Sequence, residues 1–482
     1  MQRKFITNLA LLLLLNLLIK PFWILGIDRS VQNAVSPQSF GIYSAIFSFS
    51  LLLNILLDFG ITNFNNKNIA QNNNLLNKHL SSIVLLRVAL GAVYFIITIA
   101  AGFIIGYTSD ELLMLMVLGF NQFLLSFILY LRSNIAGLHL FKTDSIISVL
   151  DRTLMIGICA YLLWGRGSTG QPFEIWWYVY AQTAAYLATI CITFVIVIKK
   201  AKLKRLYWNK TFLLVVLKKS YPYAVLVLLM TFYNRIDTVM LERMLPDGKE
   251  QTSIYVSAYR LLDSANMIAF LFAGLLLPMF SRMIKLKHNV DKLVKLSYSI
   301  LAFGSIIVAV GSFFYSDYIM ELLNTNHIEE SSKVFGVLMS CFIAISITYV
   351  FGTLLTANGN LMQLNIMASI GMALNIVLNI FLIPLYKAYG SALSSLITQF
   401  ITAMFQVYLC QKVFKFRVNY RFLITLFVFL IGVIIFNYVS LKMPVNDWIM
   451  KFVIMAIMST LFAFAIRLIN LKALYNVVKN DT

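Results

Sequence analysis

The chain has 482 residues, of which 60% are hydrophobic and only 12% are charged, and its mean hydropathy is +0.83. A soluble globular protein carries about 25% charged residues. The composition therefore excludes a soluble globular protein and indicates a polytopic membrane protein. The formal net charge of +20 does not indicate nucleic-acid binding. The basic residues lie in short loops beside apolar segments, where they orient membrane helices.

About 20 apolar residues cross a bilayer as a helix, and dividing the chain at its polar stretches gives about fourteen such segments. Among them are 39–62, 361–385 and 389–411. The predicted fold class is therefore an all-α membrane protein. The first segment resembles a signal peptide, but it contains Lys20 and Pro21 and lacks a small-residue cleavage site. We predict that it is an uncleaved helix and that the proline bends it, because proline removes a helix hydrogen bond.

Several of the N-terminal segments carry charges at or near membrane depth: Asp58, Arg87 and the adjacent pair Asp151 and Arg152. Such charges cost about 2.5–3.5 kcal/mol each, so they usually face a cavity, a partner or a substrate. Arg87 and Arg152 are candidate substrate-binding residues, although an arginine at their depth can also extend to the lipid headgroups. Asp58 lies close to the inner end of its segment and is a candidate gating residue or a loop contact.

Lysine and arginine gather in the loops on one side of the predicted membrane, as at Lys199, Lys200 and Arg205, whereas the opposite loops are acidic, as at Asp110 and Glu111. This asymmetry predicts that both termini are cytoplasmic. The basic stretch 199–219 also contains large apolar residues. We predict an amphipathic linker on the inner membrane surface, and an ordinary topogenic loop is an equally good interpretation.

Two short similarities suggest an internal repeat. The stretch 41–45 matches 253–258, and the stretch 136–140 matches 357–361, at nearly the same offset. We therefore predict an N-lobe of six helices over 1–198, the linker 199–219, a C-lobe of six helices over 220–413, and two added helices with a cytoplasmic tail over 414–482. Since six is an even number, the two lobes would be parallel repeats about an axis along the membrane normal.

The C-lobe opens with two apolar segments, 220–245 and 251–282, that together carry four charges: Arg235, Asp237, Arg260 and Asp263. Lys20 and Arg235 lie equally far into the first segments of the two lobes. We predict that Lys20, Arg235 and Arg260 bind substrate and that Asp237 and Asp263 couple transport to an ion. The alternative is that these charges only pair with one another and hold helices together. Cations exceed acids at this depth, which favours an anionic substrate.

No pattern typical of an enzyme is present in the sequence. The four histidines do not cluster, no glycine-rich loop marks a nucleotide site, and no serine or cysteine nucleophile has a neighbouring base. The four cysteines fall in apolar segments without metal or redox spacing. We therefore predict no catalytic residue, no metal and no cofactor.

Three stretches resemble a known family. They are FGIYSAIFSFSLLLNILLDFGITNF at 40–64, YNRIDTVML at 233–241 followed by IYVSAYRLLDSANMIAFLFAGLLLPMFSRM at 254–283, and LLTANGNLMQLNIMASIGMALNIVLNIFLIPLYKAYGSALSSLITQF at 354–400. Their order and spacing resemble those of the O-antigen-type polysaccharide flippases, a branch of the multidrug/oligosaccharidyl-lipid/polysaccharide exporter superfamily.

The resemblance implies two pseudo-symmetric six-helix lobes in a V shape, with the first, second, seventh and eighth helices lining the cavity and two further helices outside. It implies an undecaprenyl-diphosphate-linked oligosaccharide as substrate, flipped across the bacterial inner membrane by alternating access, with H⁺ or Na⁺ as the coupling ion. A diphosphate suits the surplus of cations, because Arg and Lys bind phosphate oxygens strongly. The expected partners are membrane lipid and a glycan polymerase, and the protein is expected to be a monomer.

Two alternatives remain open at the level of the sequence. A multidrug exporter of the same fold would favour an acidic cavity for cationic drugs. A membrane scaffold of a glycan-assembly complex would need no polar cavity at all, and its intramembrane charges would be paired and dry.

Overall fold

The computed structural model describes residues 14–16, 18–19, 21–62, 65, 69, 75–138, 140–165, 173–201, 210–416 and 419–469. In these ranges the regular structure is helical and contains no strand. Helices suit an apolar chain in a bilayer, because every backbone polar group there must be bonded within the protein. Ten helices in the described part of the chain are long and apolar enough to cross a membrane.

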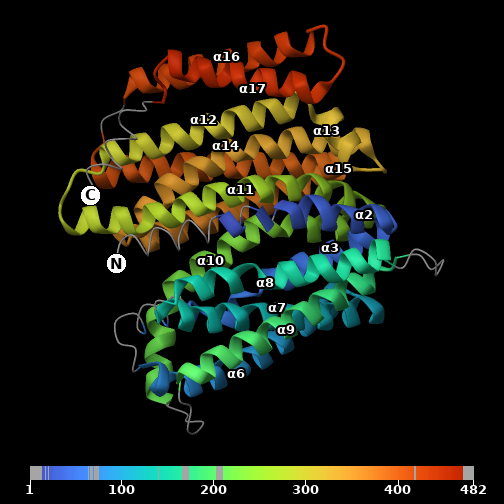
Figure 1. The fold of residues 1–482 in the computed structure, drawn as a ribbon, viewed down its shortest axis with the longest axis vertical. Coiled ribbons are helices and arrows are strands. Elements are labelled where there is room, and N and C mark those ends of the chain that lie inside the picture. The colour runs from blue at the N-terminus through green and yellow to red at the C-terminus, as the bar shows by residue number, and fades with distance from the viewer. Residues whose placement is uncertain are drawn as a thin grey trace. The chain divides into compact units, whose positions relative to one another are not determined.

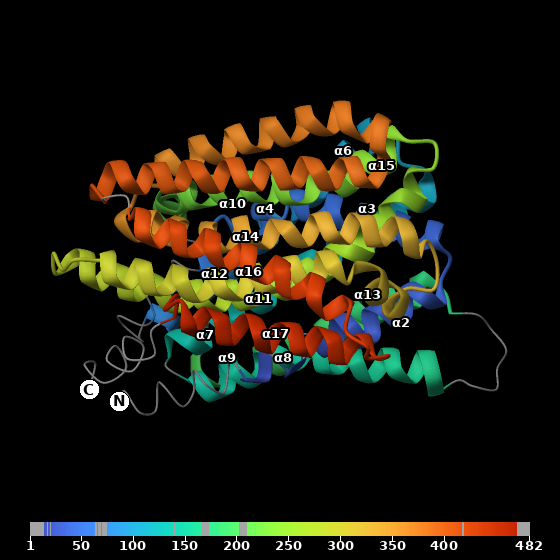
Figure 2. The same ribbon diagram turned by 90° about the horizontal axis from the view of Figure 1, so that it is seen from above.

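The chain divides into two compact units, Met1–Ser253 and Ile254–Thr482. The first unit contains, in chain order, η1 (Trp23–Asp28), α2 (Arg29–Ala34), α3 (Pro37–Leu52), α4 (Ile55–Asp58), α6 (Leu75–Ile105), α7 (Ser109–Gly137), α8 (Phe141–Ala160), η2 (Tyr161–Gly165), α9 (Ile175–Ala201) and α10 (Lys210–Met244). Helix α7 packs against α3, α6, α8 and α9, and α10 packs against α3. Figures 1 and 2 show α7, α8 and α9 running side by side.

The helix α11 (Gly248–Lys285) begins in the first unit and continues into the second. The second unit then contains α12 (Asp291–Phe314), α13 (Ser316–Leu323), α14 (Ile328–Asn358), α15 (Leu361–Phe414), α16 (Tyr420–Leu441) and α17 (Trp448–Ala465). Helix α14 packs between α12 and α15, while α16 and α17 pack against each other and against α12 (Figure 1). Buried Phe429, Val433 and Met455 lie in the core that joins α16 and α17 to α12.

The predicted number of about fourteen spans is not confirmed. The segment predicted over 39–62 contains two helices, α3 and α4, because the chain leaves the helical conformation at Leu53. Helix α4 ends at Phe59, which is left-handed with a φ of 48°. Helix α3 is 16 residues long. Much of the first predicted segment lies outside the described residues.

The boundary predicted between the segments 361–385 and 389–411 is present inside α15. Lys387 has a φ of 52° and a ψ of −133°, so α15 consists of two helices that meet at a sharp break just after Pro384. A β-carbon on Gly390 would lie 2.1 Å from the carbonyl oxygen of Leu382, so only glycine permits this close turn. The 54 residues of α15 are therefore long enough for two passes through a bilayer.

The predicted linker 199–219 is described only in part, because residues 202–209 lie outside the described ranges. From Lys210 onward the chain is already helical, and α10 runs without interruption from Lys210 to Met244. The last ten residues of the predicted linker are thus the first turns of this helix. Six of these ten residues are leucine or lysine, which have high helix propensity.

Gly41 brings α3 into close contact with the first turn of α11. A β-carbon at this position would lie 1.6 Å from the carbonyl oxygen of Lys249. We expect Gly41→Ala to force the two backbones apart and to cost about 1–3 kcal/mol of stability, the usual cost of overpacking. The matched control is Gly157→Ala in α8, where an added β-carbon meets nothing within 4 Å.

The measurement is the midpoint of thermal unfolding of the two purified variants in detergent. A clear decrease for Gly41→Ala with no decrease for Gly157→Ala is the expected result. Equal midpoints would show that the contact between α3 and the start of α11 is not as close as described.

Candidate functional site

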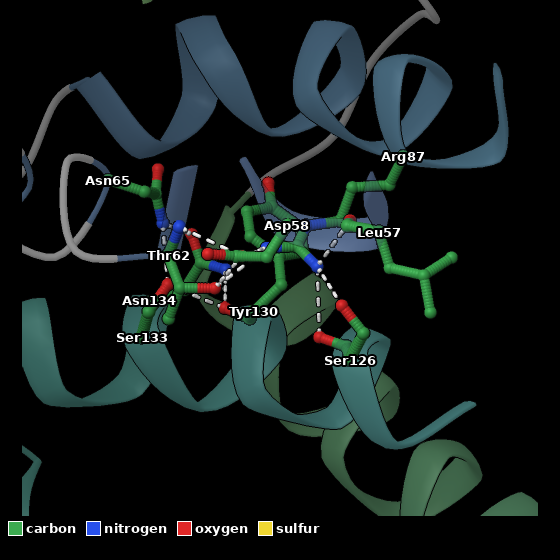
Figure 3. A network of polar contacts seen from close by, with 9 residues as sticks. All are labelled: Leu57, Asp58, Thr62, Asn65, Arg87, Ser126, Tyr130, Ser133 and Asn134. Carbon is green, nitrogen blue, oxygen red and sulfur yellow. Dashed lines mark hydrogen bonds and ion pairs between the residues drawn. The ribbon is translucent and has the colours of Figure 1, made fainter. Parts of the chain in front are cut away.

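An extensive charged network in the first unit surrounds Arg87 of α6 (Figure 3). Its side chain is only 1% exposed and pairs with the carboxylate of Asp58 at the end of α4. One guanidinium nitrogen donates to the hydroxyl and the carbonyl oxygen of Ser126 at 2.8 and 3.0 Å. The other donates to the Thr62 hydroxyl at 2.7 Å, and that hydroxyl in turn donates to Asp58.

The network continues along α7. The Arg87 guanidinium lies 4.9 Å from the centre of the Tyr130 ring, and the Asn65 amide donates to Ser133 at 2.9 Å and to Asn134 at 3.0 Å (Figure 3). Arg87 is buried and Asp58 is 26% exposed. An ion pair with a buried partner resists the loss of the other partner, because a buried charge would be left uncompensated. The network therefore joins α4, α6 and α7. It also pairs Asp58, predicted as a gating residue or a loop contact, with Arg87, predicted as a substrate-binding residue.

A second cluster, here called the Arg152 cluster, lies where η1, α3, α8 and α9 meet. Its members have aromatic or polar side chains and are Trp23, Asp28, Tyr43, Asp151, Arg152, Tyr178, Gln182 and Tyr186. The Arg152 guanidinium lies 5.6 Å from the Trp23 ring centre and 5.9 Å from that of Tyr186. Its Nε lies 3.6 Å from a carboxylate oxygen of Asp151. The side chain remains 25% exposed, so it can still contact a further group.

Asp28 is the acid of this cluster that sequence reasoning missed. It is 6% exposed and accepts a hydrogen bond from the Tyr178 hydroxyl. The Tyr178 ring stacks on Trp23 at 5.9 Å and meets the Tyr43 ring edge-on at 5.4 Å, and Gln182 donates to the Tyr43 hydroxyl at 2.8 Å. The available signal was an acid just after the apolar first segment, seven residues after Pro21.

Asp28 also ends a stretch with an unusual backbone. Residues Trp23–Asp28 form a π-helix that begins two residues after Pro21, with ordinary helix before and after. Such single turns of π-helix are rare and occur frequently at functional sites. Because the π-turn carries both Trp23 and Asp28, it supplies two members of the Arg152 cluster.

The four charges predicted in the seventh and eighth segments lie on α10 and α11. In the first unit, Asp237 of α10 is fully buried and Arg235 is half-buried. In the second unit, Arg260 and Asp263 of α11 are both half-buried, and Asp263 interacts electrostatically with Tyr349 of α14. Lys20, the remaining predicted substrate-binding residue, lies outside the described residues.

A third charged group joins the turn between α10 and α11 to the start of α7. The Glu111 carboxylate lies 3.0 Å from the Lys249 ammonium and 3.3 Å from the Arg243 guanidinium. Glu111 also accepts from the Thr108 backbone, completing a capping box at the start of α7. The Arg243 guanidinium lies 4.1 Å from the Tyr107 ring centre, and burial raises the pKa of the Tyr107 phenol. The sequence had predicted Glu111 only as an acid of an outer loop.

A model of the family described as "Polysaccharide biosynthesis protein" matches residues 6–284. A comparison with curated protein sequences gives no match.

Among solved structures, the chain is similar to "Lipid II flippase MurJ, inward closed conformation", with 15% identity and a TM-score of 0.73 over 97% of this chain and 99% of that one. It is also similar to an inward-facing multidrug resistance MATE family transporter of the MOP superfamily, with 12% identity and a TM-score of 0.61 over 82% and 96% of the two chains.

A MOP superfamily transporter from Pyrococcus furiosus, whose binding pocket is described as having reverse polarity, matches with 12% identity and a TM-score of 0.59. That match covers 84% of this chain and 94% of the other. Identities this low show the fold alone. The predicted all-α membrane fold is confirmed by these matches together with the helices described above.

Proposed function

The chain belongs to the polysaccharide biosynthesis protein family, and from this premise we propose that it flips an undecaprenyl-diphosphate-linked oligosaccharide across the bacterial inner membrane. Its fold is that of MurJ and of the MATE transporters, which are carriers and not enzymes. In this proposal both termini are cytoplasmic, the two predicted lobes alternate in exposing the substrate to either side, and the lipid tail stays in the bilayer.

The observation that carries the proposal is the exposure of three arginines in the membrane-spanning helices. Arg152, Arg235 and Arg260 are partly exposed, whereas of the two predicted coupling acids Asp237 is fully buried and Asp263 is partly exposed. These three cations can therefore contact an anionic ligand. Arginine binds phosphate oxygens through paired, charge-assisted hydrogen bonds, which suits a diphosphate and disfavours a cationic drug.

The roles follow from these differences. Lys20, Arg235 and Arg260 bind the diphosphate, and Arg152 is a further contact that its exposed fraction permits. Asp237 and Asp263 couple the cycle to H⁺ or Na⁺. Arg87, being paired with Asp58 and fully buried, takes a different role: it fixes α4 and α6 to α7 and stabilises the lobe.

Deleting the gene in its native host tests the proposal. We expect the lipid-linked oligosaccharide to accumulate on the cytoplasmic face of the membrane and the surface glycan to disappear, because the substrate can no longer cross. A plasmid copy of the gene should restore both. If deletion instead leaves the glycan intact and increases sensitivity to cationic drugs, the protein is a multidrug exporter and the proposal is wrong.

A further inference from the structure

A pocket of about 560 Å³ lies at one end of the first unit, outside the network of Arg87 and the Arg152 cluster. Its walls come from the beginnings of four helices, α3, α7, α9 and α11, and from the residues just before them. Small-ligand sites enclose about 300–1,000 Å³, so this pocket has the size of one. The topology predicted from the basic loops places this end of the unit at the outer face of the membrane.

The side chains that line the pocket combine hydroxyls, carboxylates and aromatic rings. Ser36 and Ser39 contribute hydroxyl groups that lie 2.9 Å apart, and Asp110 and Glu174 contribute exposed carboxylates. The half-buried Trp176 contributes an indole ring, which is held in place by stacking on Tyr180 with the ring centres 5.6 Å apart.

A fixed charge pair completes the lining. The Lys249 ammonium lies in the wall and is 3.0 Å from Glu111, which also lines the pocket. Glu111 is thereby neutralised, and its other oxygen is engaged by Arg243 and the Thr108 backbone. The carboxylates of Asp110 and Glu174 are then the acceptors available to a ligand, beside the hydroxyls of the serines.

This combination suits a neutral ligand with many hydroxyl groups. Carboxylates accept hydrogen bonds from hydroxyls, serine hydroxyls both donate and accept, and an indole ring covers an apolar face. Two exposed carboxylates oppose an anion. Among the described residues no group of acids, histidines or cysteines converges to hold a metal ion, so a bound divalent cation is not supported either.

We infer that this pocket binds the saccharide end of the transported molecule, on the outer side, and so selects the glycan separately from the diphosphate. The inference rests on the proposed function for the identity of its ligand. Trp176 lies under the apolar face of a sugar ring, and Asp110 and Glu174 accept bonds from its hydroxyls. Recognition of the sugar and recognition of the diphosphate are then carried by different residues.

The test uses the full-length protein in lipid nanodiscs and, as probe, the free oligosaccharide released from the host's own lipid-linked glycan, without lipid or phosphate. Binding is measured by saturation-transfer NMR and by titration. We expect the wild type to bind it and Trp176→Ala to weaken binding about tenfold, which corresponds to about 1.4 kcal/mol. Glu174→Gln, a change at an exposed position, should also weaken binding.

The matched control is Trp164→Ala, because Trp164 is 62% exposed and does not line the pocket. This variant should bind the oligosaccharide as the wild type does. Equal binding by Trp176→Ala, Glu174→Gln and the wild type would overturn the inference. The inference would also be overturned if the pocket bound the organic cation tetraphenylphosphonium, in a manner that depends on Trp176, and bound no saccharide.

A parallel assay of the intact lipid-linked glycan separates this inference from the proposed function. Translocation by the wild type without any binding of the free saccharide would overturn the pocket assignment and leave the flippase proposal standing. Binding of the free saccharide without translocation of the intact molecule would contradict the flippase proposal and leave the pocket standing.

Discussion

Replacing Arg235 or Arg260 by alanine is expected to abolish surface glycan in the native host while the protein still reaches the membrane. Both side chains are partly exposed in α10 and α11, and in the proposed function they hold the diphosphate. A hydrogen bond to a charged group contributes about 1.5–3 kcal/mol, so each loss weakens the diphosphate complex by roughly one to two orders of magnitude. The measurement is complementation of the deletion strain, with the amount of protein in the membrane determined in parallel.

Two further variants make this experiment specific. Arg235→Lys keeps the charge but loses the paired geometry of the guanidinium, so it should restore the glycan only in part. Lys333→Ala is the control, because Lys333 is 63% exposed and contacts Glu329 on its own helix. It should complement fully. Full complementation by both Arg235→Ala and Arg260→Ala would exclude the diphosphate role and favour a scaffold that needs no charged cavity.

Replacing Arg87 by methionine is expected to lower the free energy of unfolding more than Gly41→Ala or Arg132→Met does. The substitution leaves the Asp58 carboxylate without its cation, and it removes the bonds to Thr62 and Ser126. Breaking a buried ion pair by removing one partner costs about 3–5 kcal/mol. The measurement is the midpoint of thermal unfolding of the purified protein in detergent, which should decrease strongly.

The double variant Arg87→Met with Asp58→Leu separates the ion pair from simple loss of packing. If the pair is what stabilises the lobe, the double variant should be less destabilised than the two single effects added together, by about 0.5–3 kcal/mol. The matched control is Arg132→Met, which removes a pair with Asp144 between α7 and α8. Arg132 is 21% exposed, against 1% for Arg87, so its loss should cost less. Additive effects at Arg87 and Asp58, or equal costs at Arg87 and Arg132, would contradict this role.

The helices themselves were largely predictable, because the pattern of apolar segments and polar loops follows from the thickness of a bilayer. The break at Lys387 was predictable as well, since a proline and a polar turn separate two apolar stretches there. The split of 39–62 into α3 and α4 was not. The stretch is mostly apolar, and only the backbone at Leu53 reveals the break.

Contacts between charged residues were the part that the sequence could not supply. Arg87 and Asp58 are 29 positions apart and meet because α4 packs on α6. Asp28 and Tyr178 are 150 positions apart and meet because η1 and α9 enter the same cluster. Depth along a helix can be counted from the sequence, but the direction in which a side chain points depends on the packing of neighbouring helices.

The most direct test of the proposed function uses the purified protein in proteoliposomes loaded with the host's undecaprenyl-diphosphate-linked oligosaccharide. The appearance of the glycan at the opposite leaflet is followed with a glycan-modifying enzyme that cannot cross the membrane. We predict that the wild type moves the glycan far faster than empty liposomes do, and that the double variant Arg235→Ala with Arg260→Ala does not. A wild-type rate equal to that of empty liposomes would contradict the proposal that this protein is a lipid-linked oligosaccharide flippase.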